Sequence, residues 1–258
     1  HDGFEELGVQ RHPQPYVWTV MGDGQCGILL TSPKHQVEGW FRFVTDGADG
    51  EVESVAVYPA SLENRVYLWV KRTINGSTVR YREKLCLRSE ALGAATTKLA
   101  DCGTFAAGPV TSVTAAQLAS ETGLVAWGTT GGVSGFIGTL SADGLTGSLS
   151  ADASGIIALG ATYTNVFVGL PYVGKYKSAK LAYGSEGGTA LMARKIIEQV
   201  GLLMMDVHRD AIRVGPSFDK LIKYIIKSDT LIALTDALAV KATHDQILQP
   251  FGGSWSPD

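Results

Sequence analysis

Residues 65–85 read RVYLWVKRTINGSTVRYREKL, and this stretch decides the fold class. Two runs with β-strand signals flank Asn75 and Gly76. Asn and Gly tolerate the positive φ that both central positions of a type I′ turn require, and the twist of that turn matches the flanking strands. The stretch therefore predicts an antiparallel β-hairpin.

The two-residue turn also predicts the register of the hairpin. Val70 faces Tyr81 on one side of the hairpin, and Trp69 faces Arg82 on the opposite side. An aromatic and β-branched pair on one face, with a cation over the indole on the other, would stabilise the hairpin modestly.

Strand signals continue upstream of the hairpin. The runs are YVWTV (16–20), CGILLT (26–31), EGWFRFV (38–44) and EVESVAVYP (51–59). Turn-forming residues separate them: GDG at 22–24, SPKHQ at 32–36 and TDGADG at 45–50. With the two hairpin strands, these runs predict six antiparallel strands in meander order.

Six such strands correspond to roughly one and a half to two blades of a β-propeller, which needs about four to eight blades to close. Alone they would leave bare edges, which invite aggregation. Either they form a sandwich, or missing blades lie outside the chain, which would then be part of a longer polypeptide. We favour the second interpretation and expect a mainly β protein in which residues 1–88 form a partial β-propeller-like platform.

The rest of the chain divides into three segments. Residues 89–110 are rich in small residues and predict a linker. Residues 111–181 contain short strand signals with glycine corners, which predict an inserted small β-barrel or β-sandwich domain. Residues 182–258 predict a return segment of mixed β-structure with short helices. Within it, helix propensity favours a helix broken at Gly201, while a buried strand over 202–207 is the alternative.

Composition excludes several classes of protein. The chain has 22 basic and 25 acidic residues, so no global cationic field holds a polyanion tightly, although passive contact with DNA remains compatible. Three cysteines (Cys26, Cys86 and Cys102) without a CxxC pair predict a reducing compartment and no disulfide framework. No apolar run reaches the roughly 18 residues of a membrane span, so we expect no membrane anchor.

Two sequence motifs approach known chemistry and then depart from it. Residues 169–176 have the glycine and lysine spacing of a phosphate-binding loop, but Tyr176 replaces the hydroxyl ligand of Mg²⁺ and Pro171 removes an amide. His208-Arg209-Asp210 resembles the start of a kinase catalytic loop, but Gly215 stands where that loop needs Asn. We interpret the first as a strand ending in a turn and the second as a coincidence.

Metal ligation has no better pattern. Asp46, Asp49 and Glu51 cluster in a turn, yet the twelve-residue calcium loop would need Glu where Val57 stands. The five histidines, at positions 1, 12, 35, 208 and 244, show no zinc-binding spacing. We therefore predict no catalytic, cofactor-binding or metal site, no cofactor, and no enzyme.

Two blocks of the sequence resemble a known family. The first comprises VEGWFRFVTDG (37–47), EVESVAVYPA (51–60) and the hairpin stretch, and the second comprises GLPYVGKYKSAKL (169–181) and LLMMDVHRDAIRVGP (202–216). In order, spacing and turn chemistry, these blocks resemble the bacteriophage tail nozzle or tail tubular protein B family of short-tailed phages. Residues 113–160 do not match the insertion of that family.

The resemblance implies a structural virion protein. Such a protein is a subunit of a ring, usually a homohexamer, that forms part of the DNA ejection channel, docks on the tail adaptor protein and offers side surfaces to tail fibres or spikes. Genomic DNA passes through its lumen without sequence-specific binding. The expected location is the phage tail of the virion, with assembly in the host cytoplasm. The family implies no catalytic residues.

The alternative is a carbohydrate-binding or hydrolysing β-propeller that acts as a phage adhesin. Its candidate glycan-binding residues are Trp18, Trp40, Trp69 and Trp127. Core packing or subunit-interface packing is the competing explanation for the same tryptophans.

Overall fold

The computed structural model describes residues 3–32, 37–45, 50–87, 100–139, 141, 146–177, 184–185, 188–189, 199–204, 207–208, 212–223, 240–241 and 244–250. The chain divides into two compact units, residues 1–173 and 174–258. In the described residues the regular structure is β-strand, apart from one 3-10 turn, η3 (Ala116–Leu118). The prediction of a mainly β protein is confirmed.

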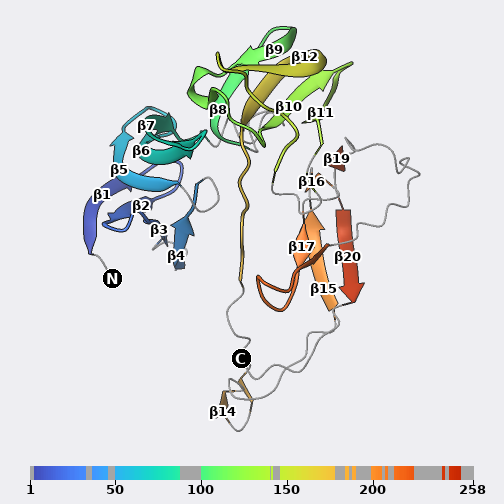
Figure 1. Cartoon of the computed structure of the whole chain (residues 1–258). Helices are drawn as coiled ribbons and strands as arrows, with labels where there is room; N and C mark the ends of the chain where they lie inside the picture. Colours follow the sequence, from blue (N-terminus) through green and yellow to red (C-terminus); the bar gives the residue numbers. More distant parts are fainter. Residues whose placement is uncertain are drawn as a thin grey trace. The chain divides into compact units, whose positions relative to one another are not determined.

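The first unit begins with two antiparallel meander sheets (Figure 1). Sheet A contains β1 (Phe4–Gln10), β2 (Tyr16–Met21), β3 (Cys26–Ser32) and β4 (Val37–Phe43). Sheet B contains β5 (Glu51–Tyr58), β6 (Arg65–Ile74) and β7 (Ser77–Lys84). All six predicted strands are present, and β1 adds a seventh that the sequence reading missed.

The hairpin β6–β7 has the predicted turn and register. Asn75 and Gly76 have φ values of 46° and 73°, and the pairs Val70–Tyr81 and Trp69–Arg82 lie opposite each other. The predicted cation–indole contact is wrong, because the Arg82 guanidinium lies 5.8 Å from the centroid of the Tyr67 ring. Tyr67 is the diagonal neighbour of Arg82 on the same face, within reach of a long side chain.

Sheets A and B pack face to face on one apolar core. Its buried members are Trp18, Val20, Cys26, Ile28, Val52, Val55, Val66, Leu68 and Val70. A Cβ atom on Gly8 of β1 would lie 3.1 Å from Val57 Cγ2 of β5, so the two sheets approach closely there. Two stacked meander sheets are the arrangement of neighbouring propeller blades and equally of a sandwich. Within the described residues no sheet closes into a barrel.

A third sheet, sheet C, completes the first unit. It contains β8 (Asp101–Ala106), β9 (Val110–Thr114), β10 (Val125–Thr130), β11 (Val133–Ile137) and β12 (Ile156–Leu170). The order is β11-β10-β12-β8, and β9 pairs with β12 outside this path. The long strand β12 serves both sides: Ile156–Ala158 and Tyr163 pair with β9, while Val166–Leu170 pairs with β8.

The predicted linker over residues 89–110 is wrong where β8 lies. The residues of β8 are mostly small and have little apolar content, so the local sequence did not reveal a strand. Its hydrogen-bonding partner β12 lies about sixty residues later, and the Phe167 ring covers Gly103, where a Cβ atom would be 2.2 Å from Phe167 Cζ. A glycine in the strand thus makes room for an aromatic ring of the neighbouring strand.

The second unit consists of short antiparallel pairs in its described part. These are β13 (Gly184–Ser185) with β14 (Gly188–Thr189), β15 (Gln199–Met204) with β20 (His244–Pro250), β16 (Val207–His208) with β19 (Val240–Lys241), and β17 (Arg213–Val214) with β18 (Ile222–Lys223).

The predicted helix broken at Gly201 is wrong over Gln199–Met204, because these residues on both sides of Gly201 form strand β15 and pair with β20. The alternative strand over 202–207 is correct for Leu202–Met204. Residues 190–198 and 224–239 of the segment predicted to contain short helices lie outside the described residues.

Candidate functional site: a buried joint and an apolar sheet face

The hairpin β6–β7 contributes to two hydrophobic cores. Near its open end, Val66, Leu68 and Val70 belong to the core between sheets A and B. Near its turn, Ile74 belongs to the core of sheet C, and Val79 and Tyr81 pack against that core. One hairpin therefore links two parts of the first unit, and the side chain between the two cores is Arg72.

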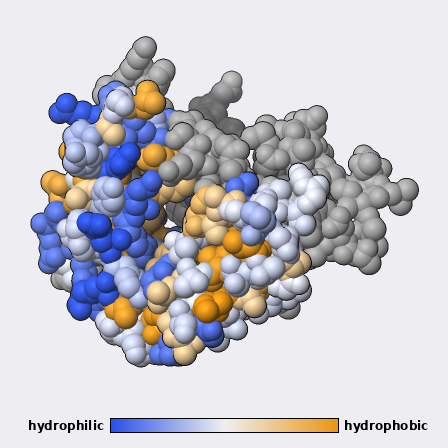
Figure 2. All heavy atoms as spheres, turned by 90° about the horizontal axis from the view of Figure 1, so that it is seen from above, coloured by the Kyte–Doolittle hydropathy of each residue, from blue (hydrophilic) through white to orange (hydrophobic). Residues whose placement is uncertain are grey.

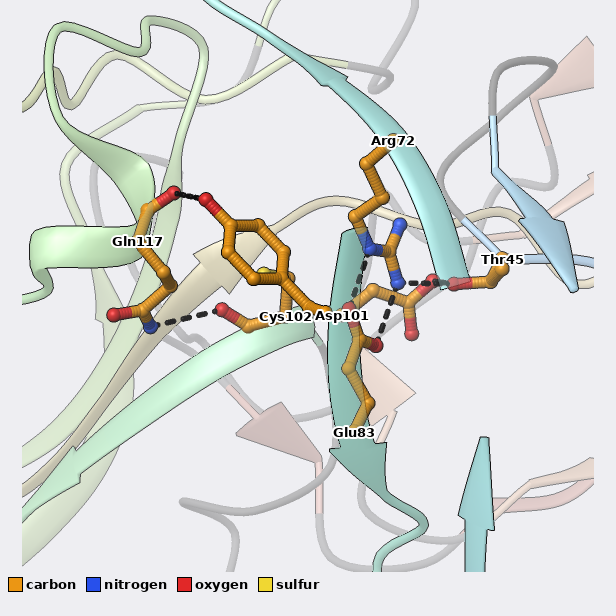
Figure 3. Close-up of polar contacts among 7 residues, drawn as sticks. Thr45, Arg72, Glu83, Asp101, Cys102 and Gln117 are labelled. Atoms are coloured by element: carbon orange, nitrogen blue, oxygen red, sulfur yellow. Dashed lines mark hydrogen bonds and ion pairs between the residues drawn. The ribbon is translucent and has the colours of Figure 1, made fainter. Parts of the chain in front are cut away.

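Arg72 is completely buried and lies in a network of four side chains (Figure 3). Its Nε and Nη2 donate hydrogen bonds to Glu83 Oε1 and Oε2 at 2.6 and 2.7 Å. Nη2 also donates to Thr45 Oγ1 at 2.6 Å, and Thr45 Oγ1 donates to Asp101 Oδ2 at 2.8 Å. The network joins the segment after β4, the hairpin and the start of β8.

The charge of Arg72 is stabilised inside the protein. Burial acts to lower the pKa of the guanidinium, but the hydrogen bonds and negative charge of Glu83 outweigh it, so the pKa lies above its ordinary value. A buried guanidinium with a two-pronged carboxylate partner has little conformational freedom. The arrangement is suited to fixing the angle between packed elements.

Two more contacts attach the hairpin to the region around η3, and a third joins that region to β8. Tyr81 Oη donates to the Gln117 carbonyl oxygen at 2.8 Å, and Gln117 Nε2 donates to the Cys102 carbonyl oxygen at 3.2 Å (Figure 3). At the turn, the Asn75 amide donates to Glu121 Oε2 at 2.6 Å. We call these contacts and the Arg72 network the joint.

The outer face of sheet A carries a row of apolar side chains. Strand register places Val9, Val17, Leu29 and Trp40 in one row across all four strands. Val9 and Trp40 are each 58% exposed, and the Phe4 ring stacks on Trp40 with centroids 6.2 Å apart. The row and its neighbours Phe4 and Leu7 form what we call the apolar face. Exposed apolar patches of this kind mark interaction surfaces.

The four tryptophans considered as glycan-binding residues divide into two pairs. Trp18 and Trp127 are buried, at 2% and 6% exposed, and Trp18 Nε1 donates to Gln10 Oε1 at 3.1 Å. Trp40 and Trp69 are exposed, and they lie on sheets A and B. Core packing therefore explains the first pair, and only the second pair is accessible to a partner.

Trp127 belongs to an aromatic row that crosses sheet C. In register, the row runs Phe136, Trp127, Phe167 and Phe105. A cavity of about 10 Å³ beside it is lined by Ala100, Val125, Ala126, Trp127, Phe136 and Phe167. This space holds at most one water molecule, so the row packs the sheet and offers no room for a ligand.

The motif residues singled out from the sequence are not brought together. Gly169 and Leu170 end β12, and residues 171–177 continue without regular structure. His208 lies in β16, whereas Arg209 and Asp210 lie outside the described residues. Asp46 and Asp49 also lie outside them, and Glu51 forms an ion pair with Lys71 at 2.9 Å.

Across the part of the chain that the structure describes, no group of three or more His, Cys, Asp or Glu residues could hold a metal ion. The three cysteines are thiols, with Cys26 and Cys102 buried and Cys86 exposed. In the same described part, no helix is long and apolar enough to cross a membrane.

Comparison of the chain with protein-family models and with curated proteins returns no match. The joint and the apolar face are therefore the observations from which a function is inferred. The joint was not foreseen from the sequence. The one sequence feature that indicates the joint is Arg72, which occupies an inward-facing strand position between Val70 and Ile74.

Proposed function

We propose that the chain is a structural subunit of a virion, part of a ring-shaped tail nozzle that surrounds the DNA ejection channel. The observation that carries the proposal is the apolar face of sheet A. A sheet that buries one side on sheet B and leaves apolar side chains on the other is suited to pack against a further sheet. In this proposal such a sheet comes from a further propeller blade or from a neighbouring subunit.

The size of the exposed side chains supports an assembly interface. Phe4 and Leu7 are 60% and 62% exposed, and Trp40 is 58% exposed. Complete burial of a large apolar side chain contributes about 1.5–3 kcal/mol. Large amphipathic aromatic residues such as Trp40 are also the type that dominates binding energy in protein interfaces.

The joint supports a mechanical role. A ring that guides DNA must keep the angle between its parts under load, and the buried network around Arg72 connects sheets A, B and C without a flexible side chain at its centre. In this proposal the ring docks on the tail adaptor and carries fibres or spikes on its sides. The propeller-like platform, the homohexamer and the location in the phage tail are parts of the same proposal.

A carbohydrate-binding adhesin is the second candidate, favoured by one observation. The stacked rings of Phe4 and Trp40 are exposed together on sheet A. Flat exposed aromatic faces also suit the apolar faces of sugar rings. The two candidates therefore make different predictions for the same residues.

Mass photometry and electron-microscopy class averages of the purified protein test the proposal. We expect rings of about six subunits with a central hole. Val9→Lys and Trp40→Asp place charges on the apolar face and should give monomers that keep the wild-type circular dichroism spectrum. Leu62→Asp is the matched control, because Leu62 is 88% exposed outside that face, and it should keep the rings.

A wild-type monomer would overturn the ring assignment. If that monomer also binds specific glycans on an array, and Trp40→Ala abolishes the binding, the adhesin is the correct assignment. Rings that persist in both charged variants would show that the apolar face is not the assembly interface.

A further inference from the structure

The outer face of sheet B has the opposite character to that of sheet A. Strand alternation places its outward side chains in three columns. The β6 column is Arg65, Tyr67, Trp69 and Lys71; the β7 column is Arg80, Arg82 and Lys84; and the β5 column contains Ser54, Ala56 and Tyr58. We call this surface the basic face.

The basic face is positive although the whole chain carries a formal charge of −3. It has five basic residues, Arg65, Lys71, Arg80, Arg82 and Lys84, and two acidic neighbours, Glu51 and Glu53. In Figure 2, strongly hydrophilic residues gather at the left of the view, the side on which β1 to β7 lie in Figure 1. A local positive field of this kind attracts polyanions.

Contacts within the basic face orient its cations. The Arg82 guanidinium lies over the Tyr67 ring at 5.8 Å, which leaves the edge of the guanidinium for a further partner. Arg80 and Lys71 form ion pairs with Glu53 and Glu51 at 2.8 and 2.9 Å. Trp69 is 38% exposed between Arg82 and the small side chain of Ser54.

The spacing of these groups indicates the chemistry of the partner. Alternate residues of a strand lie about 6.8 Å apart, so β7 presents three successive cations at that interval. This repeat suits a polymer that carries one negative charge on every monomer. Beside the cations, the indole of Trp69 borders Ser54 and Ala56, whose small side chains leave room for a flat ring. Aromatic side chains next to a cationic track are the features that hold unpaired bases.

We propose that the basic face binds single-stranded nucleic acid. Arg80, Arg82 and Lys84 contact successive phosphates, and a base stacks on Trp69 above the small side chains of β5. The inference goes beyond the structural role proposed above and stands on this face alone. Duplex DNA fits less well, because its bases are paired and cannot stack on the indole. Acidic polysaccharides fit less well, because they carry no aromatic base to stack on the indole.

Fluorescence anisotropy of a labelled twenty-nucleotide oligothymidylate, titrated with the whole protein at several salt concentrations, tests the proposal. We expect binding that weakens as salt rises, since phosphate contacts release counterions. An unlabelled duplex of the same length and a polyuronate should compete poorly. Better competition by the polyuronate would assign the face to acidic glycans and overturn the proposal. Better competition by the duplex would overturn the part of the proposal in which an unpaired base stacks on Trp69.

Four variants separate stacking from charge. Trp69→Ala should weaken binding about 5- to 150-fold, which corresponds to about 1–3 kcal/mol for one stacked base, and Trp69→Phe should retain most of it. Arg82→Gln with Lys84→Gln should reduce the salt slope by about 1.4, at about 0.7 for each phosphate contact. Glu53→Gln should strengthen binding, because Arg80 then loses its ion pair with the Glu53 carboxylate.

Arg42→Gln on sheet A is the matched control. Arg42 is an exposed arginine outside the basic face and should leave the affinity unchanged. Equal losses in Arg42→Gln and Arg82→Gln would mean that only the net charge matters, and would overturn the proposed site. Absence of binding at low salt would overturn it as well. Neither result bears on ring formation, which mass photometry measures independently.

Discussion

Replacing Glu83 with Gln tests whether the buried joint holds the first unit together. The amide has nearly the shape of the carboxylate, so packing is preserved, but the buried Arg72 loses the negative charge of its two-pronged partner. Removal of one member of a buried ion pair typically costs about 3–5 kcal/mol. Because a domain of this size has a total stability of about 5–15 kcal/mol, we expect a large loss.

Urea unfolding followed by tryptophan fluorescence measures this loss in both halves of the unit. Trp18 lies in the core between sheets A and B, and Trp127 lies on sheet C, so variants that keep only Trp18 or only Trp127 of the five tryptophans report on one half each. In the wild type the two transitions should coincide, because the joint couples the halves. In Glu83→Gln they should separate, with lower urea midpoints.

Double replacement provides the control for this experiment. Arg72→Met combined with Glu83→Leu removes both charges and should cost less than Glu83→Gln alone, because no uncompensated charge stays buried. A cost below about 1 kcal/mol for Glu83→Gln would refute the reasoning. Coincident transitions in that variant would show that the joint does not couple the two halves.

Two further predictions concern the hairpin turn and the core thiol. Gly76 has a φ of +73° and open space around its Cβ position, so Gly76→Ala should lower the free energy of unfolding by about 1–2 kcal/mol through backbone strain alone. Gly39→Ala, also in open space but without a positive φ, should leave the free energy of unfolding unchanged. Equal urea midpoints for the two variants would contradict this reasoning. Burial raises the pKa of the Cys26 thiol from 9.0 to about 11, so the stability it contributes is complete below about pH 9 and lost as pH rises to about 11. Cys26→Ala should show a smaller alkaline loss in urea unfolding at pH 8 and 11, and an unchanged loss would exclude this thiol as the cause.

Local chemistry predicted the strands that carry strong alternation and strong turns. Asn75-Gly76 is sufficient to set the turn and the register of β6–β7, because a type I′ turn leaves no freedom to slip. The strand β1 was missed because its Glu-Glu pair and Gly8 interrupt the apolar pattern. β8 was missed and β15 was misread because each becomes a strand by pairing with a partner forty or more residues later.

The sequence by itself determined the β class, the meander of β2 to β7 and the side of the hairpin on which each residue lies. It placed Arg72 on the same side as Val70 and Ile74, since side chains alternate along a strand. Only the tertiary structure decided that this side is completely buried and that Glu83, Thr45 and Asp101 meet there. It also decided that Val9, Val17, Leu29 and Trp40 align into one row. Both outcomes depend on contacts between distant segments, which local propensity does not encode.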